Sequence, residues 1–443
     1  MTNSSSVTTP ASSRLVERHG VLITNSLLQK THAFALFAFA ASASLSIAGA
    51  HISLGLLVLC VIVQRAWRKR HGAEGKAQRT TDNWQLTPGI EWPIIAFAAV
   101  ALISTALSEM PLASLRNLRH LLTILGAYAV AFSLRQHPEW RRPLLWTFIS
   151  VATMAAIYGL GKFAFGFSSK VWSTQGTSMT WGALCVLFMP FTLQMAIAAP
   201  LHRERWLARA QLILQIFAML FSLVRGAYLG FAASVIYLLR QYWANRRLLW
   251  QRILPVLMIL ILLVAFLPPN TVRQRLGAIV DLNTPSTQVR LIQWKYALQI
   301  TADHPLFGVG WRDLQSVLRR YAAPDHNIPE NIAKDVFSIG HFHSTYVTIL
   351  VCFGVTGFLA FAWLMLAIWR ALGTAIKHAN DERSRLIIFA SRAALLGFLV
   401  AGVFDWTFGD AEVVTMLWFV IGMGFGQATM GHFDSQKIET KTS

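Results

Sequence analysis

The sequence predicts an all-α protein that crosses a membrane about twelve times and carries one long loop on the outer side. Three observations predict this fold class. Of the 443 residues, 55% are hydrophobic and only 13% are charged, whereas soluble domains carry about 25% charged residues. The apolar residues fall into runs that approach the length needed to cross a bilayer. Lys and Arg gather in the short segments between these runs.

Twelve apolar runs predict the spans, because a membrane helix needs about 17–25 apolar residues and tolerates fewer where it is shielded. The candidate spans are residues 33–48, 52–63, 92–107, 118–134, 144–163, 179–198, 207–223, 227–239, 253–267, 345–368, 386–403 and 413–428. The chain therefore divides into an N-terminal tail (1–32), nine spans (33–267), an outer loop (268–343), three spans (344–431) and a C-terminal tail (432–443).

The basic residues orient these spans. The net charge is +19, but most of it lies in short segments at 65–79, 135–142, 202–209, 240–247 and 370–392. All five fall on the same side of the predicted bundle, which is the pattern of cytoplasmic loops. Both termini join that side. We therefore expect no nucleic-acid partner, since the positive charge orients spans and forms no binding surface.

The loop 268–343 is too long for an idle connection between two spans. Within it, Thr284 and Pro285 are typical of a helix start, and apolar residues recur at helical spacing over 289–300. The pair His304–Pro305 ends this helix. A second amphipathic helix is expected after the Gly-Val-Gly at 308–310, up to Pro324.

The segment SLVRGAYLG (222–230) lies between two apolar runs whose far ends are both basic. Because both far ends belong in the cytoplasm, these runs form a hairpin with Arg225 and Gly226 at its outer apex. An arginine at that depth is costly unless it faces a polar cavity or a partner. Arg225 is thus a candidate for binding an anionic group, and a snorkelling side chain that anchors the turn is the alternative.

The segment RLIQWKYALQITADHPLFGVGW (290–311) places Arg290 and Trp294 four residues apart, on one helix face. The following His-Pro and Gly-Val-Gly predict a sharp reversal of the chain. An arginine beside an indole suits a sugar or a phosphate. A helix that lies on the membrane, anchored by Trp294, explains the pattern equally well.

The segment GHFHSTYVTIL (340–350) places His341 and His343 where an apolar run begins, at the level of a lipid headgroup. A neutral imidazole accepts a proton near pH 7, since its reference pKa is about 6.5. The alternatives are a helix cap or a metal ligand. Two histidines at i and i+2 converge poorly on a metal and no D-x-D occurs, so we predict no metal site. Asp410 and Glu412 are a weak signal that marks an outer turn.

Arg116 and Arg119 lie three residues apart at the outer end of the fourth predicted span, with His120 beside them. On that side they run against the trend for basic residues, so they are candidates for binding an anionic headgroup. Anchoring to lipid phosphates is an equal alternative. Lys162 and Lys170 are weaker candidates of the same kind.

Together these segments resemble the O-antigen ligase family, membrane glycosyltransferases that share a domain with O-antigen polymerases. The resemblance rests on SLVRGAYLG, on RLIQWKYALQITADHPLFGVGW and on HSTYVTILVCFGVTGFLA (343–360), in this order around one large outer loop. It covers about residues 222–360. The family's Ser-Arg-Gly stands here as Val224-Arg225-Gly226, so the serine is absent while the arginine and glycine remain.

The resemblance implies transfer of an undecaprenyl-pyrophosphate-linked O-antigen polysaccharide onto a sugar of the lipid A core, at the periplasmic face of the inner membrane. It implies that Arg225 and Arg290 handle the pyrophosphate and that His343, rather than His341, is the catalytic histidine. The family is regarded as metal-independent and inverting. The outer loop would then be periplasmic, and the partners would be the lipid-linked donor, the lipid A core and membrane lipids.

The chemistry of the residues agrees with this implication. Glycosyl transfer from a lipid pyrophosphate needs an activated hydroxyl and stabilisation of the departing diphosphate. Without an acidic metal site, guanidinium groups take the place of Mg²⁺, because arginine fits phosphate oxygens with two donors. We expect His343 to act as general base. We expect Arg116, Arg119, Trp294 and His341 to bind substrate, and neither a metal nor another cofactor to take part.

Four other functions remain open. An O-antigen polymerase uses the same donor and extends a second lipid-linked glycan, and a lipid-linked oligosaccharide transferase acts on protein. A solute transporter would show internal repeats and charges near the midplane, whereas the ionisable residues here gather at the outer boundary. A flippase would leave the ordered Arg225, Arg290 and His343 unexplained.

Overall fold

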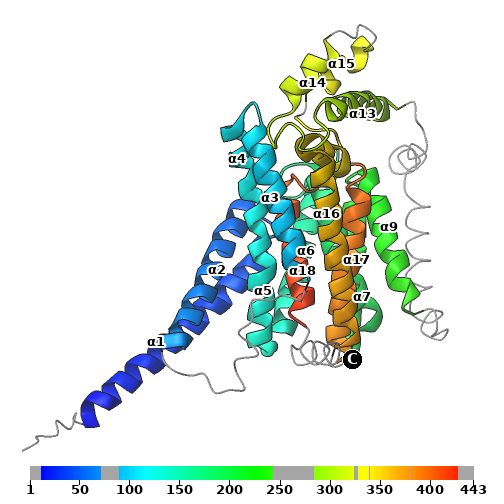
Figure 1. Ribbon diagram of the computed structural model, residues 1–443. Coiled ribbons are helices and arrows are strands. Elements are labelled where there is room, and N and C mark those ends of the chain that lie inside the picture. Colours follow the sequence, from blue (N-terminus) through cyan, green and yellow to red (C-terminus); the bar gives the residue numbers. More distant parts are fainter. Residues whose placement is uncertain are drawn as a thin grey trace, which may run out of the picture.

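The computed structural model describes residues 11–70, 89–242, 284–323, 328–338, 340–379 and 381–427. Within these ranges the chain is helical and contains no strand, which confirms the all-α class (Figure 1). The helices are α1 Ala11–Ser42, α2 Ile47–Arg70, α3 Glu91–Leu107, α4 Pro111–Leu118, η1 Arg119–Ile124, α5 Leu125–Gln136, η2 Pro138–Trp140, α6 Arg141–Ala164, α7 Ser178–Ala198, α8 His202–Leu220, α9 Arg225–Arg240, α13 Pro285–Asp303, α14 Gln315–Ala322, α15 Glu330–Val336, α16 Thr345–Lys377, α17 Glu382–Ala401 and α18 Ala411–Phe425.

The bundle is built around α7. This helix is apolar on all sides, a pattern typical of a helix enclosed by other helices. The whole of its most apolar stretch is buried inside the protein, against 39% for α2. Helices α8, α9 and α17 pack directly on it. The core therefore lies along α7, and α2 runs along the outside of the bundle.

Five described helices are long and apolar enough to cross a membrane, namely α2, η2 with α6, α7, α16 and α17. Two shorter apolar helices, α3 and α18, accompany them. The protein is therefore a polytopic membrane protein. The total of twelve spans stays a prediction, and the expected span 253–267 lies outside the described residues.

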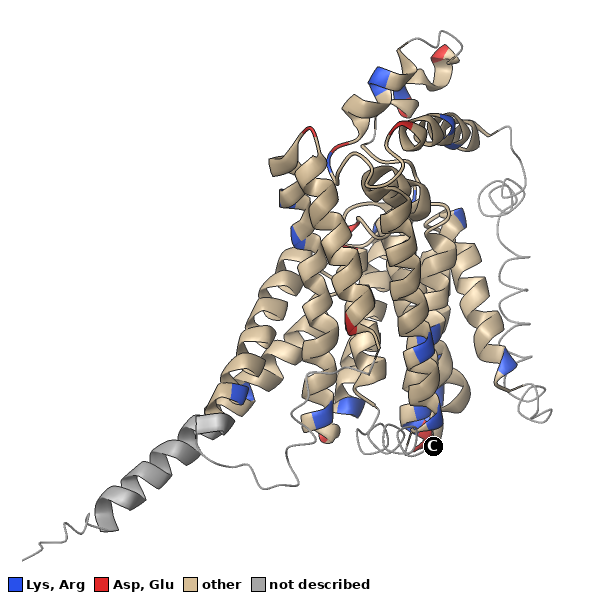
Figure 2. Ribbon diagram, in the orientation of Figure 1, with Lys and Arg blue, Asp and Glu red and all other residues tan. Residues whose placement is uncertain are grey.

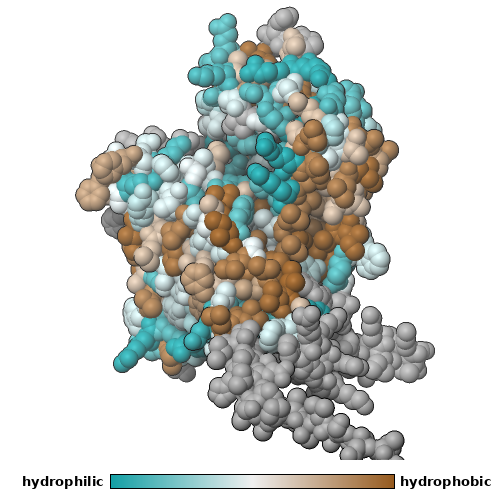
Figure 3. Space-filling model, turned by 90° about the vertical axis from the view of Figure 1, so that its left-hand side faces the viewer, coloured by the Kyte–Doolittle hydropathy of each residue, from teal (hydrophilic) through white to brown (hydrophobic). Residues whose placement is uncertain are grey.

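Lys and Arg gather at the end of the bundle away from α13, α14 and α15 (Figure 2). The last turns of α5, α9 and α16 contribute Arg135, Arg240 and Lys377 to that end. On the face toward α1, α2 and α4, apolar side chains cover much of the middle, and hydrophilic side chains gather above and below (Figure 3). This distribution fits a bilayer around the middle of the bundle.

Three predicted spans differ from the structure. The run 118–134 is broken into α4, the 3-10 helix η1 and α5, so the chain changes helix type where Arg119 and His120 lie. The turn between the first two helices lies at 43–46 instead of 49–51, because α2 already begins at Ile47. In addition, α1 begins at Ala11, inside the predicted tail 1–32.

The two helices predicted for the outer loop are present. Helix α13 begins after Thr284, with Pro285 as its first residue, and ends before His304 as expected. Helix α14 ends before the predicted stop at Pro324. Helix α15 was not predicted. Glu109, at the corner between α3 and α4, ties this outer segment to the bundle through ion pairs with Arg312 (2.9 Å) and Arg320 (2.8 Å).

The predicted reversal at 304–310 has an unexpected partner. Helix α16 is broken at Gly354, which has φ +67°, and the segment 305–310 is inserted into the break. The amides of Val309 and Gly310 donate to the carbonyls of Val351 and Cys352, both at 3.0 Å. In return, the amide of Val355 donates to the carbonyl of Pro305 at 2.8 Å. The inserted segment thus satisfies backbone groups that the break would otherwise leave unpaired.

Glycine is required on both sides of this contact. A Cβ on Gly308 would collide with the carbonyl of Val351, and a Cβ on Gly354 would collide with the backbone of Leu306 and Phe307. Both glycines also have positive φ, which a side chain makes unfavourable. Gly308 of the Gly-Val-Gly motif is therefore explained by close packing of two backbones, whereas a Cβ on Gly310 would collide with the side chains of Ser108 and Ser114.

We expect Gly308→Ala to lower the free energy of unfolding by more than about 1 kcal/mol, because alanine adds both a backbone collision and a disfavoured φ. Thermal unfolding of the detergent-purified protein, followed by tryptophan fluorescence, measures this as a lower Tm.

The matched control is Gly161→Ala in α6, where an added Cβ meets no atom within 4 Å. Its Tm should stay the same or rise, since alanine favours a helix over glycine. Equal Tm values for the two variants would contradict the proposed packing of the inserted segment.

Candidate active site

A cavity of about 320 Å³ opens where three helices begin. The first turns of α7, α9 and α13 line it, together with the segment that follows α17. Backbone N–H groups at a helix start are unpaired and carry partial positive charge, so helix starts favour anions. The lining residues used below are Lys170, Arg225, Ser286, Arg290, Trp294 and Asp405.

Arg225 is the first residue of α9. The chain reaches it through Leu223, which has the left-handed φ of +59°. The guanidinium donates from Nη2 to the hydroxyls of Ser286 (2.6 Å) and Thr284 (3.3 Å), at the start of α13. These bonds hold the start of α13 against the start of α9, and they orient Arg225 along the cavity wall.

Arg290 and Trp294 line the same cavity from one face of α13, as their spacing predicts. The indole N–H of Trp294 donates to the carbonyl of Phe342 at 2.9 Å, which joins α13 to the segment before α16. Arg290 is partly buried, and its Nε has no hydrogen-bond partner among the described residues. Burial lowers the pKa of Arg290, Asp405 opposes that shift, and Arg225 adds to it.

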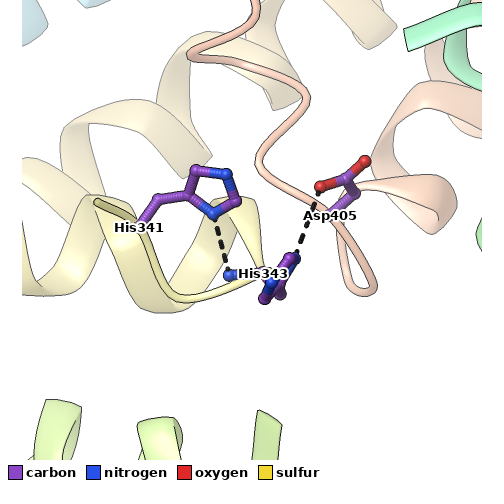
Figure 4. Close-up of side chains that lie close together, drawn as sticks. All are labelled: His341, His343 and Asp405. Carbon is purple, nitrogen blue, oxygen red and sulfur yellow. Dashed lines mark hydrogen bonds and ion pairs between the residues drawn. The ribbon is translucent and has the colours of Figure 1, made fainter. Parts of the chain in front are cut away.

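His343 is buried directly beside this cavity, with 7% of its surface exposed. It has φ +49°, and its backbone N–H donates to Nδ1 of His341 at 3.2 Å (Figure 4). Its own Nδ1 lies 4.0 Å from Oδ1 of Asp405, which lines the cavity. His343 itself is not among the lining residues, and it adjoins the cavity at Asp405.

Two hydrogen bonds, one to its side chain and one to its backbone, hold Asp405 in place. Its Oδ1 accepts from the amide of Trp406 at 2.8 Å, and its carbonyl accepts from the hydroxyl of Thr345 at 3.0 Å. Because Thr345 is the first residue of α16, the segment after α17 is fixed to the start of the helix that follows His343. The distance between His343 and Asp405 is therefore set by the framework.

The electrostatics favour a neutral histidine beside a carboxyl group. Burial, together with His341 and Arg290, lowers the pKa of His343 to about 3. Burial raises the pKa of Asp405 to about 6, an effect that Arg290 opposes. At pH 7 His343 is therefore neutral and Asp405 mostly ionised, so the pair is a neutral imidazole facing a carboxylate. A neutral imidazole can accept a proton.

Leu223 and His343 are the two non-glycine residues with positive φ in the part of the chain that the structure describes. Leu223 lies two residues before the motif residue Arg225, and His343 is the motif histidine itself. Strained backbone of this kind persists only where the surrounding structure imposes it, and it clusters at functional sites.

His341, His343 and Asp405 could also hold a metal ion, since one ligand atom from each lies within 4.8 Å of the others. The prediction of no metal site did not include Asp405. Two features disfavour a cation here. Nδ1 of His341 already accepts the amide of His343, and the charge of Arg290 acts on both His343 and Asp405.

The other predicted residues lie elsewhere. Neither Arg116 nor Arg119 lines this cavity, and Arg119 lines a second one. Lys162 donates to the carbonyl of Ser173 at 3.1 Å and lies over the ring of Trp172, as a residue that holds a loop does. Asp410 caps α18 and accepts from Thr180 at 2.7 Å, which fits the predicted outer turn.

Asp405 is the residue that sequence reasoning missed. It lies 62 positions after His343, in a short turn between two apolar helices. The signal available was an acidic residue at the outer end of a span, within FDWTFGD.

Comparison with known proteins addresses the motif-bearing part of the chain. A search of the curated proteins found no match to the sequence. The family model described as O-antigen ligase matches residues 210–362, a segment that includes Arg225, Arg290 and His343. The resemblance predicted from the motifs is therefore confirmed over this segment: residues 210–362 match the model of the O-antigen ligase family.

Proposed function

We propose that this protein is a membrane glycosyltransferase that ligates undecaprenyl-pyrophosphate-linked O-antigen polysaccharide to the lipid A core oligosaccharide at the periplasmic face of the inner membrane. The observation that carries the proposal is the cavity where Arg225 and Arg290 meet three helix starts, next to His343. These two arginines and the histidine all lie within the matched segment 210–362. The gathering of Lys and Arg at the opposite end of the bundle supports cytoplasmic termini and a periplasmic segment 268–343.

The diphosphate of the donor binds in this cavity. Arg225 and Arg290 offer guanidinium donors, and the starts of α7, α9 and α13 offer partial positive charge. Charge on the diphosphate grows as its bond to the sugar breaks. Groups already oriented toward that charge stabilise the transition state more than the bound donor. Trp294 provides an apolar surface for the sugar.

His343 is the general base. It takes the proton from a hydroxyl of the acceptor sugar as that oxygen attacks the anomeric carbon of the donor. The bond between this carbon and the diphosphate oxygen breaks with its electron pair, and the diphosphate leaves. A single displacement of this kind inverts the anomeric carbon. The carboxylate of Asp405 stabilises the imidazolium that forms, as in other histidine–carboxylate pairs.

The donor itself raises the basicity of this pair. Without substrate, the charge of Arg290 lowers the pKa of both His343 and Asp405. The negative charges of a bound diphosphate offset that guanidinium, so they favour protonation of His343. His343 is thus a stronger base with the donor bound than without it.

An O-antigen polymerase is the second candidate, since the matched domain is shared with polymerases. The two functions differ only in the acceptor. We expect purified protein in lipid nanodiscs to transfer glycan from a defined lipid-linked donor to lipid A core, and not to a second donor molecule. Elongation of the donor pool without labelling of lipid A core would make the protein a polymerase.

We expect His343→Ala to lower the rate of transfer by roughly 10²–10⁴-fold, the usual contribution of a general base, with donor binding retained. The reconstituted assay measures the rate, and binding of radiolabelled donor measures retention. His304→Ala is the matched control, because His304 is exposed on the same outer segment and lines neither described cavity.

The same assay in EDTA separates a base from a metal ligand. Transfer that persists in EDTA agrees with His343 as base. Transfer that stops in EDTA and returns with Mg²⁺ would contradict His343 as base. It would instead favour a metal ion bound by His341, His343 and Asp405.

The pH dependence of kcat/KM reports ionisations of the free enzyme. We expect kcat/KM to fall as the pH falls through about 6, because Asp405 takes up a proton there and loses the charge that stabilises the imidazolium. His343, with its pKa at about 3, adds nothing above that range. Asp405→Asn should be slower at high pH and should lose this acid limb. A limb that persists unchanged in Asp405→Asn would remove Asp405 from the mechanism.

A further inference from the structure

A second cavity, of about 570 Å³, lies on the other side of the bundle. Its walls come from α2 and from η1 with the start of α5, and it shares no residue with the first cavity. The lining residues are Ile47, Ala48, His51, Leu54, Gly55 and Val58 on α2, and Arg119, His120, Leu122, Thr123 and Leu125 opposite. We call it the α2 groove.

The α2 groove is long, mostly apolar and open to the bilayer. Residues 47, 51, 55 and 58 follow one face of α2, so the groove extends along about 16 Å of helix. Most of its lining is apolar. Exposed apolar side chains border it, among them Ile52 on α2 and Leu122 on η1. An acyl chain fits such a strip, because it buries apolar surface in a groove that already faces lipid.

One end of the α2 groove is cationic. Arg119 is exposed at the start of η1, and its side chain makes no hydrogen bond or ion pair with any residue in the described ranges. His120 beside it is partly buried, and its ring lies 5.8 Å from that of Trp311 in the outer segment. The guanidinium therefore lies at the loop end of the bundle, at the depth of lipid headgroups. Arginine at that depth pairs readily with a phosphate.

Histidines complete the polar end. His51, on α2, bonds through Nε2 to the hydroxyl of Thr415 on α18 at 3.3 Å. Among the residues that line the groove, Arg119 is the one Lys or Arg. A single positive charge above an apolar strip matches a headgroup with one phosphate more closely than a polyanion.

We propose that the α2 groove binds an anionic membrane phospholipid, one whose headgroup adds no positive charge to its phosphate, with that phosphate on Arg119 and one acyl chain along α2. This site is separate from the donor cavity. Helix α18 lies between them: Thr415 contacts His51 on one side, and Asp410 contacts Thr180, near the start of α7, on the other. A lipid here would support the corner where α4, η1 and α5 replace a continuous span.

The test uses the full-length protein in phosphatidylcholine nanodiscs that contain a phosphatidylglycerol probe with a photoreactive group in its acyl chain. After irradiation, mass spectrometry of peptides locates the label. We expect label on α2 and on residues 119–125, at a level above that of a phosphatidylcholine probe with the same photoreactive group.

Two variants test the two ends of the site. Gly55→Phe fills the groove, since a Cβ there meets no atom within 4 Å, and it should remove most of the groove label. Arg119→Gln should lower the phosphatidylglycerol label about tenfold, toward that of the phosphatidylcholine probe, because a charge-assisted hydrogen bond is lost. The controls are Gly161→Phe, at an equally open glycine of α6, and Arg319→Gln, at an exposed arginine of α14 that lines neither cavity.

Three results would overturn the proposal: equal labelling of the groove by both probes, label confined to other helices, or the same loss in the controls as in the test variants. Because labelling needs neither donor nor acceptor, it can succeed where the proposed glycosyl transfer fails. The two proposals therefore stand or fall separately.

Discussion

The insertion of residues 305–310 into the broken helix α16 is the contact on which the rest of the outer end depends. The break lies about 14 Å along α16 from its start, where water is scarce and an unpaired backbone group costs several kcal/mol. The inserted segment pairs these groups. It also fixes the end of α13 relative to the start of α16, and so brings Arg290 and Trp294 close to His343.

The site combines excess positive charge with burial of part of that charge. Two arginines and three helix starts surround a small cavity, and the described carboxylate that lines it is Asp405. Without a bound anion the site is unfavourable, because Arg225 and Arg290 repel each other. In addition, Nε of Arg290 is buried with no hydrogen-bond partner among the described residues. An anion of high charge relieves both costs. The diphosphate proposed as ligand would supply such a charge to the two arginines.

Much of this arrangement could be predicted from sequence, because its signals are local. Thr284, Pro285 and His304 mark the ends of α13, and the basic loops place Arg225 at a hairpin apex. The break in α16 could not be predicted, since Gly354 lies in a continuous apolar run and the partner segment is some 45 residues earlier. Asp405 was missed for the same reason: its proximity to His343 arises from the packing of the start of α16 against the end of α17.

The complete enclosure of α7 has a consequence for biosynthesis. The neighbours that cover it include α8 and α9, which follow it directly, but also α17 and α18, which are made last. A ribosome has therefore translated nearly the whole polypeptide before α7 acquires its final surroundings. Until then, α7 lacks part of its cover, so a truncated product would expose the candidate span that is most completely buried in the finished protein.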